Sequence, residues 1–166
     1  MRAVLLFMCF TLGVLGQNKE AEKKVKESLK KDEVTLVKDD DAKMNAAIAE
    51  ARKTVDEFIN ALKAKDPKAK HFAVKAPLVD GDQVEHVWLV NLKVSGDKLS
   101  GVIGNKLQIV KNYKMGQAVT LGKKEITDWM YVKDGVVQGN VTLKAMFHTM
   151  DPEEVKALKK MMGWSK

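Results

Sequence analysis

Two carboxylates stand out because apolar residues surround them. Glu85 lies in the run VEHVWLV, and Asp128 lies in the run ITDWMYV. Glycoside hydrolysis uses two carboxyl groups about 5 to 9.5 Å apart across a cleft, one to protonate the leaving group and one to act as base or nucleophile. The pair therefore offers one alternative function, a cell-wall-directed hydrolase that uses Glu85 and Asp128.

The same two runs carry side chains suited to binding. Alternation along a strand places His86 and Trp88 on the face opposite Glu85, so Glu85 and His86 cannot act as an adjacent acid-base pair. Aromatic rings offer a large stacking surface for a sugar or an extended peptide. The candidate ligand-binding residues are the polar and aromatic residues of the expected strands: His86, Trp88, Asn105, Asp128, Trp129 and Tyr131.

Each candidate also has a packing interpretation. His86 fits a half-buried position at a sheet edge. Trp129 and Tyr131 share a face that Asp128 does not, and they fit a core in which neighbours satisfy their polar tips. Whether the row Thr127, Trp129 and Tyr131 faces a pocket or the core helix decides between the two interpretations.

Metal and nucleophile chemistry lack a comparable pattern. The histidines His71, His86 and His148 are far apart and lack the i, i+4 spacing of a zinc-binding helix. None of the serines lies in a nucleophile elbow. We therefore assign no catalytic residue, no metal site and no cofactor, and we favour a function other than catalysis.

The first residues have the pattern of a secretory signal peptide. Arg2 precedes an apolar run from Ala3 to Gly16, and polar Gln17 follows. As a helix this run would be about 21 Å long, shorter than a hydrocarbon core of roughly 30 Å, so we expect no permanent membrane span. We predict that residues 1–16 are cleaved near Gly16 and that the mature protein is periplasmic or extracellular.

The formal net charge is +7, and cleavage would remove one of these charges with Arg2. Nearly all the cations are lysines, and Arg52 would be the single arginine of the mature chain. Recognition of phosphates and base edges relies on bidentate arginine, so we expect no nucleic-acid partner. Association of a lysine-rich surface with anionic lipid or polymer stays open as a second alternative function.

The remaining residues indicate one domain behind a spacer. Residues 17–40 alternate charges of both signs, which is typical of an exposed spacer. From Asp41 onward, apolar residues at three- and four-residue spacings predict an amphipathic helix, with Asp39–Asp41 as its cap and Pro67 beyond its end. The stripe consists of Met44, Ala47, Ile48, Ala51, Val55, Phe58, Ile59 and Leu62.

Beyond His71, β-rich runs alternate with turn signals such as Asp134-Gly135. The expected strands lie within 71–78, 84–94, 98–105, 107–113, 117–121, 125–132 and 136–147. They predict a curved antiparallel sheet of six or seven strands that could close partway into a half-barrel. Asp151, Pro152, Glu154 and Gly163 predict a short C-terminal helix. The expected fold class is α+β.

Several motifs between Phe72 and Met150 resemble the YegJ-like family of bacterial domains of unknown function. They are Glu85-His86-Val87-Trp88, Gly101-Val102-Ile103-Gly104-Asn105, Ile126-Thr127-Asp128-Trp129-Met130-Tyr131-Val132, Asp134-Gly135, Gly139 and Thr142. The resemblance implies an α+β domain and carries no established activity or catalytic residue.

The sequence therefore predicts a signal peptide at 1–16, a charged spacer at 17–40 and a single α+β domain at 41–166. The function we expect is non-catalytic binding in the cell envelope, with an envelope protein, a peptide or a glycan as partner. The pattern leaves the oligomeric state open.

Overall fold

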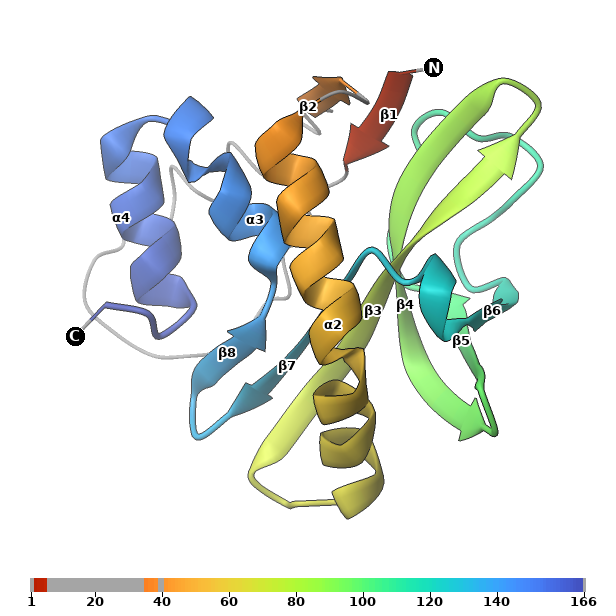
Figure 1. Cartoon of the computed structure of the whole chain (residues 1–166), viewed down its shortest axis with the longest axis horizontal. Helices are drawn as coiled ribbons and strands as arrows, with labels where there is room; N and C mark the ends of the chain where they lie inside the picture. Colours follow the sequence, from red (N-terminus) through yellow and green to blue (C-terminus); the bar gives the residue numbers. More distant parts are fainter. Residues whose placement is uncertain (1, 6–34, 39–40, 166) are drawn as a thin grey trace.

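The computed structural model describes residues 2–5, 35–38 and 41–165. The rest of the predicted signal peptide and of the predicted spacer lies outside these residues. Helix α2 (Ala42–Ala64) crosses one face of an open sheet, and α3 (Val141–Met146) and α4 (Pro152–Met161) follow at the C-terminal end (Figure 1). The predicted α+β fold is thus confirmed.

The amphipathic helix begins where its cap predicts. The Asp41 carboxylate accepts hydrogen bonds from the backbone N–H groups of Lys43, at 2.9 Å, and Met44, at 3.0 Å. These bonds satisfy donors that have no partner within the helix. At the other end, Lys65 adopts a left-handed conformation (φ 51°) and closes α2 ahead of Pro67.

Six antiparallel strands form the main sheet, in the spatial order β6-β5-β4-β3-β7-β8. Their bounds are β3 Ala69–Asp80, β4 Gln83–Ser95, β5 Lys98–Ile103, β6 Ala118–Gly122, β7 Asp128–Lys133 and β8 Val136–Gly139. Short 3₁₀ turns, Lys123–Glu125 and Phe147–Thr149, join β6 to β7 and α3 to α4. The sheet stays open because β6 and β8 do not pair with each other.

The two long strands change partners along their length. β4 pairs with β3 from Gln83 to Leu89 and with β5 from Leu89 to Ser95. The register of β4 shifts between Val90 and Lys93, around Asn91, whose φ is 53°. β3 shifts in the same way around His71 (φ 56°) where it pairs with β7. Such bulges bend a strand and increase its twist, and this lets β3 and β4 diverge.

Two of the strand predictions are wrong. Residues 107–113 form no strand and instead belong to the long connection 104–117 between β5 and β6. Residues 136–147 contain only the short strand β8, which ends at Gly139, and then helix α3. Both errors have the same cause, since in each segment a carboxylate from another strand binds the backbone N–H groups, as described below.

The chain also contributes a two-stranded ribbon near its N-terminus. β1 (Arg2–Leu5) pairs antiparallel with β2 (Thr35–Lys38) and parallel with β4. β1 lies within the predicted signal peptide, and β2 lies within the predicted spacer.

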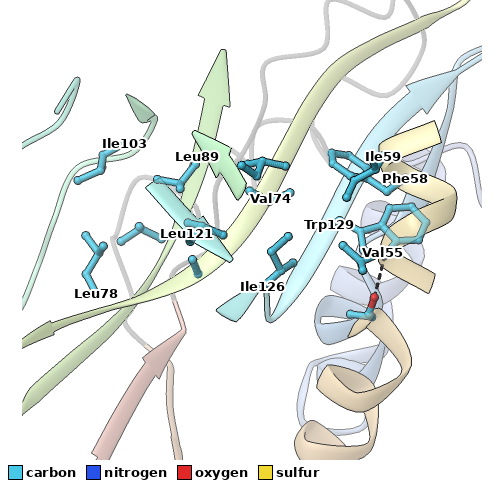
Figure 2. Close-up of a cluster of buried hydrophobic side chains, with 14 of the residues drawn as sticks. Val55, Phe58, Ile59, Val74, Leu78, Leu89, Ile103, Leu121, Ile126 and Trp129 are labelled. Carbon is cyan, nitrogen blue, oxygen red and sulfur yellow. Dashed lines mark hydrogen bonds between the residues drawn. The ribbon is translucent and has the colours of Figure 1, made fainter. Parts of the chain in front are cut away.

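The main core lies between α2 and the sheet. Val55, Phe58 and Ile59 of α2 lie against Trp129 of β7 (Figure 2). The core continues along the same face of the sheet to Leu89 of β4, Ile103 of β5 and Leu121 of β6. Burial of such side chains contributes roughly 1.5 to 3 kcal/mol each, and this places the greatest part of the stabilisation on this face.

The opposite face carries a smaller apolar cluster. Trp88, Met130 and Val137 are buried there, and Met162 and Trp164 of the C-terminal segment pack against them. The segment also pairs with β8, because the backbone N–H of Val137 donates to the Met162 carbonyl at 2.9 Å. Among the described helices, none has the length and apolar character that a membrane span requires.

Candidate functional site

Strand register brings three functional side chains into one row. Lys75 of β3 is paired with Trp88 of β4 on one side and with Asp128 of β7 on the other. Directly paired residues point to the same face of a sheet, so the three side chains lie together. All three are buried, and the exposed fraction of Lys75 is only 3%. We call Lys75, Trp88, Asp128 and Thr142 of α3 the lysine cluster.

The Lys75 amine is the centre of this cluster. Its Nζ donates to Thr142 Oγ1 at 2.7 Å and lies 4.0 Å from Asp128 Oδ2. It also lies over the Trp88 ring, 4.6 Å from the ring centroid, where a cation is attracted to the π-electrons. Burial lowers the pKa of Lys75 to about 8, and the Asp128 charge opposes this shift without cancelling it.

Asp128 is occupied by backbone groups at the start of α3. One carboxylate oxygen accepts from Trp129 N at 2.8 Å and from Val141 N at 3.2 Å. The other accepts from Thr142 N at 2.9 Å and from the Thr142 hydroxyl. Asp128 therefore caps a helix that begins 13 residues further along the chain, and this explains why α3 replaces the expected strand.

His86 lies two residues from Trp88 on the same face and is also buried. Its Nδ1 is 3.0 Å from Thr127 Oγ1. The Thr127 N–H donates in turn to the carbonyl oxygen of Lys75 at 2.8 Å. This chain of contacts fixes the imidazole relative to the lysine cluster.

Asn105 ends the pairing of β5 with β4. The Gly104 N–H donates to the Trp88 carbonyl at 2.8 Å, and Asn105 Oδ1 accepts from the Trp88 N–H at 2.9 Å. The side-chain amide oxygen thus accepts the hydrogen bond that a backbone carbonyl of a longer β5 would accept. The edge of β4 before Trp88 is left without a β5 partner.

The N-terminal strand β1 occupies that edge. Ala3, Val4 and Leu5 pair with Val84, Glu85 and His86 in parallel register. Within the described residues, β1 is the sole strand that pairs with this stretch on the side away from β3. We call Val84–His86 the β4 edge site.

The Glu85 side chain lies on the face of the sheet opposite the lysine cluster, where it binds the backbone of the long connection 104–117. Its carboxylate accepts from the N–H groups of Gln108, at 2.9 Å, Ile109, at 2.9 Å, and Val110, at 3.2 Å. Asp80 holds the next stretch by accepting from Lys111 N at 2.7 Å. These bonds use the backbone donors that a strand at 107–113 would have given to a neighbour.

The hydrolase hypothesis required Glu85 and Asp128 to face one cleft. Glu85 is an odd number of residues from Trp88, so its side chain leaves the sheet on the face opposite Trp88 and Asp128. Each carboxylate is buried and bonded to several backbone N–H groups. Two carboxylates on opposite faces of a sheet cannot flank one glycosidic bond, so this alternative is wrong for this pair.

Trp129 and Tyr131 face the core helix. Trp129 Nε1 donates to the Ala51 carbonyl at 3.1 Å (Figure 2), and the Trp129 ring lies 5.5 Å from the Phe58 ring between centroids. Tyr131, which is half-buried, stacks on Phe72 at 4.9 Å. The packing interpretation describes this row. Of the six predicted site residues, His86, Trp88 and Asp128 lie on one face, Trp129 and Tyr131 lie on the other, and Asn105 lies at the edge of β4. They do not make one surface, and ligand binding by any of them stays a prediction.

Lys75 and Thr142 are the main residues of the cluster that the sequence did not identify as candidates. The sequence does contain a signal for Lys75, since HFAVKAPL places a lysine in the middle of an apolar strand. Thr142 belongs to the family motifs, but its local sequence gave no sign of this contact because its partners Lys75 and Asp128 lie on β3 and β7. No group of three or more His, Cys, Asp and Glu that could hold a metal occurs among the residues the structure describes.

Comparison with known proteins adds relatives. The model of a family described as "Uncharacterized protein conserved in bacteria (DUF2314)" matches residues 41–165. The uncharacterized protein YegJ of Escherichia coli strain K12 is 39% identical over 116 residues, which are 70% of this chain and 74% of YegJ.

A second relative comes from Neisseria meningitidis serogroup B and carries the name of an ankyrin repeat protein. It is 32% identical over 129 residues, 73% of this chain but only 51% of the relative. The chain thus spans about half of that protein. No solved structure matches this chain.

Proposed function

Because this chain belongs to the DUF2314 family, whose description names no activity, we propose its function from the geometry: a non-catalytic, exported module that binds an extended strand of a partner. The partner is a peptide or a segment of an envelope protein. It binds at the β4 edge site, Val84–His86. The family resemblance found in the sequence is confirmed, and it supplies no competing function.

The pairing of β1 with β4 is the observation that carries this proposal. Residues 3–5 are nearly eighty residues from β4 in sequence, yet they add a parallel strand to it. An exposed strand edge presents unpaired N–H and C=O groups, and addition of a strand satisfies them. The β4 edge site can therefore hold a strand that is not its neighbour in the chain.

Neighbouring elements hold the β4 edge site in an extended, ordered conformation that a further strand can pair with. β4 pairs with β3 along the same residues on its other side. Asn105 prevents β5 from extending over the site, and Glu85 ties the long connection beside it. A backbone that is already ordered loses less entropy when it binds, so affinity is gained without new contacts.

Other features agree with an interaction role. The buried carboxylates Glu85 and Asp128 bond to backbone groups, which suits a scaffold. About half of the Neisseria relative matches this chain, and its name refers to ankyrin repeats, which build extended binding surfaces. Export rests on the predicted signal peptide, whose removal would take β1 away from the site.

The test uses the full chain carrying Val4→Pro, since proline cannot donate to a ladder and disfavours β1. The probe is a fluorescein-labelled peptide with the sequence of Arg2–Phe7, titrated by anisotropy. We expect saturable binding together with slower amide hydrogen exchange at Val84, Glu85 and His86. The same peptide with methylated backbone nitrogens should bind at least tenfold more weakly, because it keeps its side chains and loses its donors.

The edge strand β6 serves as an internal control. Ala118–Gly122 is also a strand with one described neighbour, and its exchange should not change. Absence of binding at millimolar peptide, or protection of β6 in place of β4, would overturn the proposal. Tryptophan fluorescence of the variant verifies that the core around Trp129 is intact.

A further inference from the structure

We infer that the chain's own residues Arg2–Leu5 are an internal competitor that blocks the β4 edge site until they are removed. This inference rests on the proposed function and adds its regulation. The competitor and the partner would use the same backbone groups of β4, so only one of them can be bound at a time.

The structure shows how the competitor is held. All four residues of β1 pair with β2, from Arg2 with Lys38 to Leu5 with Thr35. Three of them pair with β4 as well. β2 ends at Lys38 and α2 begins at Ala42, so three residues separate the ribbon from the core helix in the sequence. β1 therefore lies between β2 and β4, and β2 is only a few residues from α2 in the sequence.

The sequence supplies the means of release. Residues 2–5 fall inside the predicted signal peptide, and cleavage near Gly16 would separate them from the rest of the chain. β2 and β4 would both remain, and each would lose the strand that now pairs with it. Export would then produce an open site only in the compartment where the partner is located.

A tethered competitor acts through its effective concentration. In the sequence 29 residues separate β1 from β2, and a covalent tether of this length gives an effective concentration on the order of 1 mM or somewhat lower. If the free peptide binds the open site at about 100 µM, the tether raises the apparent dissociation constant about tenfold. The blockade is therefore strong enough to measure and weak enough to be reversed by cleavage.

The register also limits the chemistry of the partner. Residues paired in a ladder point to the same face, so the central residue of the bound strand lies on the Glu85 side and its two neighbours lie on the His86 side. Glu85 is buried, and like charges directly opposite one another destabilise a sheet. The partner is an extended segment whose central residue is not acidic, running parallel to β4.

The experiment compares four full-length or processed proteins with the same labelled Arg2–Phe7 peptide. Wild-type chain and Val4→Thr keep β1, because threonine retains the backbone donor and suits a strand. Val4→Pro and the chain lacking residues 1–16 lose it. We expect the first two to bind about tenfold more weakly than the last two. A peptide with aspartate at the position of Val4 should bind the open forms at least tenfold more weakly.

The outcomes separate the two proposals. Equal affinity of all four proteins, with protection at Val84–His86, would overturn the internal competitor and leave the binding site standing. Failure of the open forms to bind would overturn the proposed function itself. If the chain lacking residues 1–16 does not fold, Val4→Pro against Val4→Thr still decides the matter, since both contain the whole chain.

Discussion

At the residue scale, buried polar side chains in this domain act on backbone segments far away in sequence. Glu85 holds residues 108–110, Asp128 starts α3, and Asn105 satisfies the N–H of Trp88. Each side chain replaces a bond that regular pairing does not supply. A buried N–H or C=O without a partner costs about 1 to 3 kcal/mol, so these residues decide where strands end.

Asn105 allows this role to be tested directly. Asn105→Ala removes the acceptor of the buried Trp88 N–H, and we expect the free energy of unfolding to fall by about 1 to 3 kcal/mol. Asn105→Asp is the matched control, because its carboxylate keeps an acceptor there and gives up the donor to the Lys106 carbonyl. Urea unfolding followed by tryptophan fluorescence measures both. Equal losses for the two variants would contradict the assigned bond.

Part of the site could be predicted from the sequence, namely the part that depends on local strand geometry and not on the register between strands. Alternation along a strand correctly separated Asp128 from Trp129 and Tyr131, because it depends only on local geometry. The lysine cluster could not be predicted in this way. It requires the pairing of Lys75 with both Trp88 and Asp128, and that register is set by contacts between strands.

At the element scale, local signals predicted the helices well and the strands less well. α2 and α4 both start at the expected aspartates, whose side chains accept from N–H groups two and three residues ahead. The run at 107–113 has β-forming residues, but Glu85 and Asp80 take its donors. β-propensity measures how well a side chain packs on a pleated sheet, so it predicts a strand only where a partner strand is available. Residues 107–113 have no such partner among the described residues.

The bulge in β4 gives a prediction at this scale. Asn91 is exposed and has a φ of 53°, a left-handed conformation that costs most residues about 1 to 2 kcal/mol. Asn91→Gly should therefore leave the free energy of unfolding unchanged or raise it by up to about 1 kcal/mol. Lys93→Gly, in the same strand and also exposed, should lower it by about 0.5 to 1 kcal/mol. Thermal unfolding of both variants measures the contrast, and a loss at Asn91 as large as that at Lys93 would contradict the strain.

At the scale of the whole molecule, one sheet separates two apolar clusters, and the lysine cluster connects elements on both sides. It links β3, β4 and β7 with α3, which in turn contacts α2 through Met146 and Met44. A buried charge is costly, so the position of Lys75 should be visible in the stability of the entire fold.

The pH dependence of unfolding gives that test. The folded chain lowers the pKa of Lys75 to about 8 from an ordinary value of 10.5, chiefly through burial. Between these two values the unfolded state holds the proton that the folded state has lost. The free energy of unfolding should consequently rise as pH increases from about 8 to 10.5, by up to about 3 kcal/mol. Urea unfolding across this range, monitored by circular dichroism, measures the slope.

Lys75→Met supplies the control, since methionine has a similar length and carries no proton to titrate. Its unfolding free energy should lack the upward slope, so the two curves diverge above about pH 8. Lys123 and Lys133 do not imitate the effect. The pKa of each is raised, by hydrogen bonds to Asp56 and Asp66 respectively, so they lose their stabilising contributions only above about pH 10.5. An upward slope of the same size in Lys75→Met would place the titrating group elsewhere and contradict the lowered pKa of Lys75 in the folded chain.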